Sequence, residues 1–102
     1  MIKVNIKNKN EKVYEIVVKG HAEYDDYGKD IVCASVSTMM ITTVNNIISL
    51  DDSIIYVEDH GLLKVTIKEE TEINQKILNN VIMMLEELKK QYPKNIEIGN
   101  EV

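Results

Sequence analysis

The sequence predicts an α/β fold, a two-layer sandwich in which a mostly antiparallel five-stranded sheet carries two helices on one face, in the order ββαββαβ. Three features predict it. Five short segments alternate apolar and polar residues, as half-buried strands do. Two longer segments repeat apolar residues at helical spacing. Neither helix is apolar all round and the strands alternate, so each element has one face to bury, as in two packed layers.

The chain is 102 residues long and 44% hydrophobic, which is enough for one modest core. We therefore expect a single domain over residues 1–102. Repeats, linkers and low-complexity segments are not apparent.

The first two strands form a predicted hairpin. Ile2, Val4 and Ile6 alternate with polar residues, residues 8–11 make a polar turn, and residues 13–18 return as the second strand. Alternation alone leaves open which side of the sheet residue 21 faces. Gly20 is expected to mark a bulge or a close backbone approach that resets the alternation.

The first helix is predicted over residues 31–50, with Asp30 as its N-cap. Residues 54–58 and 62–68 follow as the third and fourth strands, joined by a turn at residues 59–61. No stretch is expected to reach the length of a membrane span.

The second helix is expected to begin after Thr71, which can cap it, and to stop before Pro93. Its apolar stripe comprises Ile73, Ile77, Val81, Met84 and Leu88. Ile96 and Ile98 then alternate with polar residues and glycine as a short final strand.

The candidate chemistry lies in residues 20–37, which hold the only cysteine, Cys33, and one of two histidines, His21. His21 follows a predicted strand, and Cys33 is third in a helix that begins after Asp30. A thiol there lies among unpaired N–H groups at the positive end of the helix, which stabilises a thiolate. Ser37 lies one turn further on the same face. A free cysteine is also often a small buried apolar residue, so spacing alone leaves both readings open.

An acidic loop separates the two candidate residues. It is either a plain solvated loop or a mobile loop beside a cleft that helps hold substrate, and we favour the second because functional residues concentrate on such loops. The proposed substrate-binding residues are Glu23, Tyr24, Asp25, Asp26, Tyr27 and Gly28. No metal is expected, because the acidic residues lack calcium-loop spacing. His60, in the turn between the third and fourth strands, is expected to be exposed and without a role.

The composition limits the partners and the compartment. The net charge is −5 and every cation is lysine, which disfavours direct nucleic-acid binding and suits a basic peptide or protein. A single cysteine cannot form an internal disulfide, and the N-terminal residues are not those of a secretion signal, so we expect a cytoplasmic protein. The uncovered face of the sheet leaves room for a homodimer contact.

The segments Gly20-His21-Ala22, Gly28, 30–34 and Val36-Ser37 together resemble the ribosomal-processing cysteine protease (Prp) family. The resemblance covers the whole chain. It implies an endopeptidase that removes an N-terminal extension from a bacterial large-subunit ribosomal protein. It also implies His21 and Cys33 as the catalytic pair, with Asp30 and Ser37 in support. Ser35 departs from the family, which more often has alanine there.

The leading prediction is therefore a cysteine endopeptidase that needs no cofactor. Cys33 attacks the scissile carbonyl as a thiolate, and His21 exchanges the proton. Two alternatives are a non-enzymatic adaptor that binds a ribosomal protein and a redox-responsive cysteine domain.

Overall fold

The structure, a computed structural model, describes residues 1–20 and 27–101, and only the backbone of residues 27–30. Five strands form one sheet in the order β3-β4-β2-β1-β5. Their bounds are β1 (Ile2–Lys9), β2 (Lys12–Lys19), β3 (Ile54–Asp59), β4 (Leu62–Ile67) and β5 (Ile96–Glu101). β1 and β5 are parallel and the other three pairs are antiparallel.

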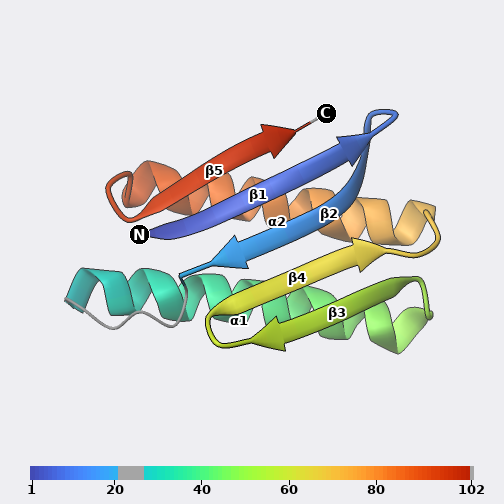
Figure 1. The fold of residues 1–102 in the computed structure, drawn as a ribbon, viewed down its shortest axis with the longest axis horizontal. Helices are drawn as coiled ribbons and strands as arrows, with labels where there is room; N and C mark the ends of the chain where they lie inside the picture. The colour runs from blue at the N-terminus through green and yellow to red at the C-terminus, as the bar shows by residue number, and fades with distance from the viewer. Residues whose placement is uncertain (21–26, 102) are drawn as a thin grey trace.

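Two helices, α1 (Tyr27–Leu50) and α2 (Glu72–Gln91), cover one face of this sheet (Figure 1). The predicted fold class and element order are confirmed. Two-residue turns close both hairpins: Asn10 and Glu11 have φ of 53° and 65°, and His60 and Gly61 have φ of 33° and 82°. Positive φ at both central residues matches the twist of paired strands, which explains these tight connections.

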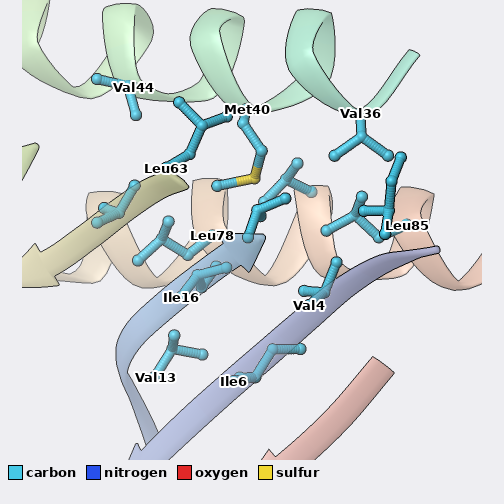
Figure 2. Close-up of a cluster of buried hydrophobic side chains, with 14 of the residues drawn as sticks. Val4, Ile6, Val13, Ile16, Val36, Met40, Val44, Leu63, Leu78 and Leu85 are labelled. Carbon is cyan, nitrogen blue, oxygen red and sulfur yellow. The ribbon is translucent and has the colours of Figure 1, made fainter. Parts of the chain in front are cut away.

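The core lies between the sheet and the helical layer. Met40 of α1, Leu78 of α2 and Ile16 of β2 lie in one cluster (Figure 2), and each is at most 1% exposed. One alternating set of strand residues enters this cluster, and the opposite set faces away from the helices. The outer face of the sheet and the outer face of the helical layer therefore do not contribute to this core.

The alternation of β2 is reset at Tyr14, earlier than the sequence predicts. Lys7 pairs with Glu15 but Asn8 pairs with Val13, so Tyr14 is an extra residue in β2. Such a bulge shifts the side-chain parity by one. Val13 and Ile16 are consequently both buried, while Tyr14 is 42% exposed.

A buried amide ties the same point of β2 to α2. The Val13 N–H donates to Oε1 of Gln75, and Nε2 of Gln75 donates to the Val13 carbonyl, both at 2.9 Å. Gln75 is only 6% exposed. Its side chain thus provides the donor and acceptor that Val13 needs in a buried place.

Thr71 caps α2 as predicted, with its hydroxyl accepting from the Asn74 N–H at 3.0 Å. The prediction for α1 is wrong, because the helix begins at Tyr27 and not after Asp30. Residues 27–29 contain no proline, and an acidic residue is as favourable within the first turn as at the cap. Asp30 is therefore the fourth helical residue, and Tyr27 and Gly28 belong to the helix and not to a loop.

The expectation that no segment reaches the length of a membrane span is also wrong. Ile31–Leu50 is, by length and composition, long and apolar enough to cross a membrane. In the fold this segment is part of α1, and 39% of its most apolar window is buried. The buried part of this apolar sequence is the inner face of a helix that packs on the core.

Candidate active site

Cys33 lies on the inner side of α1. It is the seventh residue from Tyr27, is 7% exposed and belongs to the buried core cluster. The helix field and the unpaired N–H groups act mainly within the first turn. Cys33 is one turn further in, so the argument that the helix start itself stabilises its thiolate is wrong.

Ser37 follows Cys33 by one turn on the same side of α1 and is half-buried. Ser35 points elsewhere, because its hydroxyl donates to the Ile31 carbonyl at 2.8 Å. The serine that departs from the family pattern is thus satisfied by the backbone of its own helix.

Gly20 fixes the end of β2, directly before His21. Its φ is +85°, and a Cβ added there would lie 2.7 Å from the Met1 carbonyl oxygen. Its N–H donates to the Gly61 carbonyl at 3.1 Å. The predicted close backbone approach is confirmed, and only glycine fits without a shift. The chain start and the β3–β4 turn together set where the chain leaves β2.

The β3–β4 turn brings His60 into this neighbourhood, which the sequence did not indicate. Its side chain is 97% exposed, as predicted, and its Nε2 lies 3.5 Å from Oδ1 of Asp59. The next residue, Gly61, contacts Gly20. The glycine after His60 predicts a turn, but only the pairing of β4 with β2 places that turn beside Gly20, at the end of β2.

Several predicted site residues lie outside the part of the chain that the structure describes. These are His21, Glu23, Tyr24, Asp25 and Asp26. The catalytic pair and the substrate-binding stretch therefore remain predictions. Among the side chains of residues 1–20 and 31–101, no three of His, Cys, Asp or Glu form a group that could hold a metal ion.

The chain matches the family model for cysteine protease Prp over residues 1–97. It is 32% identical to the ribosomal processing cysteine protease Prp of Staphylococcus aureus strain Mu50, over 97% of this chain and 98% of that protein. It is 26% identical to the protein of the same name from Bacillus subtilis strain 168, over 100% and 99% of the two chains.

A solved structure is similar throughout. The essential ribosomal processing protease Prp from S. aureus, in complex with a substrate peptide, has a TM-score of 0.93 and 29% identity. The match covers 99% of this chain and 100% of that chain. The sheet and both helices therefore follow the arrangement of a protease that has been crystallised with its peptide.

Proposed function

The chain belongs to the cysteine protease Prp family and is a cysteine protease of the ribosomal-processing type, and we propose that it removes an N-terminal extension from a bacterial large-subunit ribosomal protein. The match over residues 1–97, with the lone cysteine on the inner side of α1, carries this proposal. It favours a protease over the adaptor and the redox-responsive domain.

In the proposed reaction, the Cys33 thiol gives its proton to His21, and the sulfur bonds to the scissile carbonyl carbon. The tetrahedral intermediate collapses, the C–N bond breaks, and His21 returns the proton to the leaving amine. Water then attacks the thioester and passes a proton through His21 to the departing sulfur. The products are a carboxylate-ended extension, a new N-terminus and the regenerated thiol.

We assign oxyanion stabilisation to backbone N–H groups at the start of α1. The unpaired N–H groups of a helix are those of its first four residues, which here are residues 27–30. They are better donors for the oxyanion than the Cys33 N–H, which lies within the hydrogen-bonded part of the helix. Asp30 is proposed to support this turn and Ser37 to contact the reacting centre.

The burial of Cys33 favours a selective protease. Because Cys33 is only 7% exposed, a peptide cannot reach its sulfur without displacing neighbouring groups. Substrate has to make room for itself, and only a segment with enough favourable contacts can do so. We assign these contacts to Glu23, Tyr24, Asp25, Asp26, Tyr27 and Gly28, whose acids suit a basic ribosomal protein.

The same proposal includes a cytoplasmic location and a homodimeric state. A reactive lone thiol persists in a reducing compartment, and both layers of the fold have an uncovered outer face. Fractionation of cells that produce the protein at its natural level tests the location. Recovery in the membrane or secreted fraction would contradict it.

The central test uses mass spectrometry of the candidate ribosomal protein after incubation with the purified protease. We expect one new N-terminus with the wild type and none with Cys33→Ala, since thiol removal leaves no nucleophile. Circular dichroism checks that the variant is folded. Cleavage by the alanine variant at the wild-type rate would reject Cys33 as the nucleophile.

A further inference from the structure

The lysines of this acidic chain are unevenly distributed. Five of the 12 lie in residues 1–19, which contain β1, β2 and the turn between them: Lys3, Lys7, Lys9, Lys12 and Lys19. Only Glu11 and Glu15 are acidic there, so the net charge of −5 arises in the rest of the chain. The expectation that the protein does not contact nucleic acid considered only that total. Binding depends on the local surface, and the surface of this hairpin is basic.

Tyr14 projects an aromatic ring from this basic hairpin. It is the extra residue of the bulge in β2 and is 42% exposed. Bulges re-aim side chains and are common beside functional sites. Nζ of Lys9 lies 5.9 Å from the centroid of the ring, within cation–π range. The ring is therefore held against one cation, while its exposed part is available to a planar partner.

Two surface hollows, of about 250 Å³ and about 470 Å³, adjoin the Tyr14 ring. Lys9, Asn10 and Tyr14 line both of them. The other charged residues of the lining are Lys12, Lys68 and Glu70 in the smaller hollow, and Lys7 and Glu101 in the larger. Each hollow thus has more lysines than acids. We refer to Lys7, Lys9, Asn10, Lys12, Tyr14 and Lys68 together as the hairpin surface.

Two lysines of the hairpin surface are available to an anion. Within the described part of the chain, neither Lys9 nor Lys12 has an acidic side chain within salt-bridge distance. The paired lysines are Lys7, 3.6 Å from Glu15, and Lys68, 2.9 Å from Asp52. A lysine ammonium binds phosphate well. An aromatic ring between unpaired ammonium groups therefore suits a base with its neighbouring phosphates.

We propose that the hairpin surface binds single-stranded RNA, with one base stacked on the Tyr14 ring and the adjoining phosphates on Lys9 and Lys12. Proteins that bind single strands combine an aromatic platform with a basic surface along which the backbone runs. Asn10, which lines both hollows, carries an amide that pairs with base edges. Hollows beside the ring give a chain room to continue, whereas a mononucleotide needs a more enclosed pocket.

An anionic membrane and an acidic peptide fit this surface less well. Membrane binding uses exposed apolar side chains beside the lysines, but Val13 and Ile67 in the smaller hollow are only 4% and 8% exposed. An acidic peptide would pair with the lysines, but its carboxylates would leave the Tyr14 ring without a stacking partner. Single-stranded RNA is the partner that uses both the charge and the ring.

The hairpin surface is remote from the start of α1. The β1–β2 turn and the first residues of α1 lie at opposite ends of the long axis (Figure 1). RNA on the hairpin would leave Cys33, in the second turn of α1, accessible to a peptide. The choice of RNA over DNA rests on the proposed function, because an enzyme that processes ribosomal proteins works among RNA. The site itself does not depend on that function.

Fluorescence anisotropy of a labelled single-stranded RNA of about 12 nucleotides tests the stacking. Wild type is expected to bind at micromolar concentration in low salt. Tyr14→Ala should weaken binding roughly tenfold or more, because base–aromatic stacking is lost. Tyr14→Phe keeps the ring and should bind like the wild type. A duplex of the same sequence should compete poorly, because its bases are already stacked on one another.

The lysines are tested by the salt dependence of the same binding. Each phosphate contact with a single strand contributes about 0.7 to the slope of log affinity against log salt. Replacing Lys9 and Lys12 together by Gln should therefore reduce the slope by about 1.4. The matched control replaces Lys89 and Lys90 by Gln, which removes the same charge from the last turn of α2 and should keep the wild-type slope.

Circular dichroism checks that each variant is folded. A wild type that does not bind the RNA would overturn the proposal, as would a Tyr14→Ala variant that binds as tightly as the wild type. Equal salt slopes for the two lysine variants would also reject it. Tighter binding of single-stranded DNA would reject the choice of RNA, and binding of phosphatidylserine vesicles in place of RNA would assign the surface to a membrane.

The RNA surface and the proposed function can fail separately. Cys33→Ala lacks the proposed nucleophile but keeps the whole hairpin surface, so it should bind RNA like the wild type. Loss of RNA binding in this folded variant would contradict a site at the opposite end of the molecule.

Discussion

At the scale of single residues, the end of β2 is held by two glycines and by Met1. Gly20 contacts both the Met1 carbonyl and the Gly61 carbonyl, immediately before His21. These contacts involve backbone atoms, so they position the end of β2 without any side chain. The point where the chain leaves β2 is thus set by Met1 and Gly61, which are far from Gly20 in sequence.

Gly20→Ala tests this directly. Positive φ costs alanine about 1–2 kcal/mol, and the approach to Met1 adds to that cost. For a domain of this size, each kcal/mol lowers the melting temperature by roughly 4–8 °C. The control is Gly99→Ala, whose new Cβ would meet only Oδ1 of Asn5 at an ordinary 3.5 Å. Equal melting temperatures for the two variants would contradict the account of Gly20.

A second residue-scale prediction separates the two histidines. His21→Ala should slow cleavage by about 10² or more, the usual scale for loss of a general acid–base group. His60→Asn should leave the rate nearly unchanged, because that imidazole is 97% exposed and asparagine tolerates its positive φ. Single-turnover cleavage of a substrate peptide measures both. A large loss only at His60 would reverse the assignment, since its turn also borders Gly20.

At the scale of elements, Gln75 joins β2 to α2. Its amide makes two hydrogen bonds of 2.9 Å with the backbone of Val13, at the point where the bulge interrupts the sheet. These two hydrogen bonds fix the position of α2 relative to β2 in a part of the core that is otherwise mostly apolar.

Gln75→Ala should lower the free energy of unfolding by about 2–3 kcal/mol, because it leaves the donor and acceptor of Val13 buried and unpaired. The control, Gln91→Ala, lies at the exposed end of the same helix and should change little. Urea unfolding monitored by circular dichroism gives both values. A loss below the error of the measurement would mean that water replaces the amide.

At the scale of the whole molecule, the charge of −5 should act on the rate of encounter with a basic substrate. Such steering weakens as salt screens the charges. We expect cleavage to slow as salt rises, and Asp25→Asn with Asp26→Asn to reduce both the rate at low salt and its salt dependence. Alkylation of Cys33 by a small neutral reagent should stay the same. If neither the wild type nor the double variant cleaves more slowly at higher salt, electrostatic steering does not contribute to the rate.

The sequence by itself determined the elements and the fold class. Period-two alternation, helical spacing, the Thr71 cap and Pro93 are local signals, and each depends on residues that are neighbours in the chain. It also singled out Cys33 and His21, because the chain has one cysteine and the surrounding segments resemble a protease family. The start of α1 was missed, since Asp30 is compatible with both the cap and the first turn.

Only the tertiary structure decided how those elements meet. The bulge at Tyr14 and the Gln75 amide depend on the pairing of β2 with β1 and on its packing against α2. The contact of Gly20 with Met1 and Gly61 joins three segments that no local pattern relates. The sequence shows that residues 31–50 carry no charge, but only the packing of α1 on the sheet shows which of these residues face solvent. Local propensity acts over a few residues, whereas burial is decided by what packs against each face.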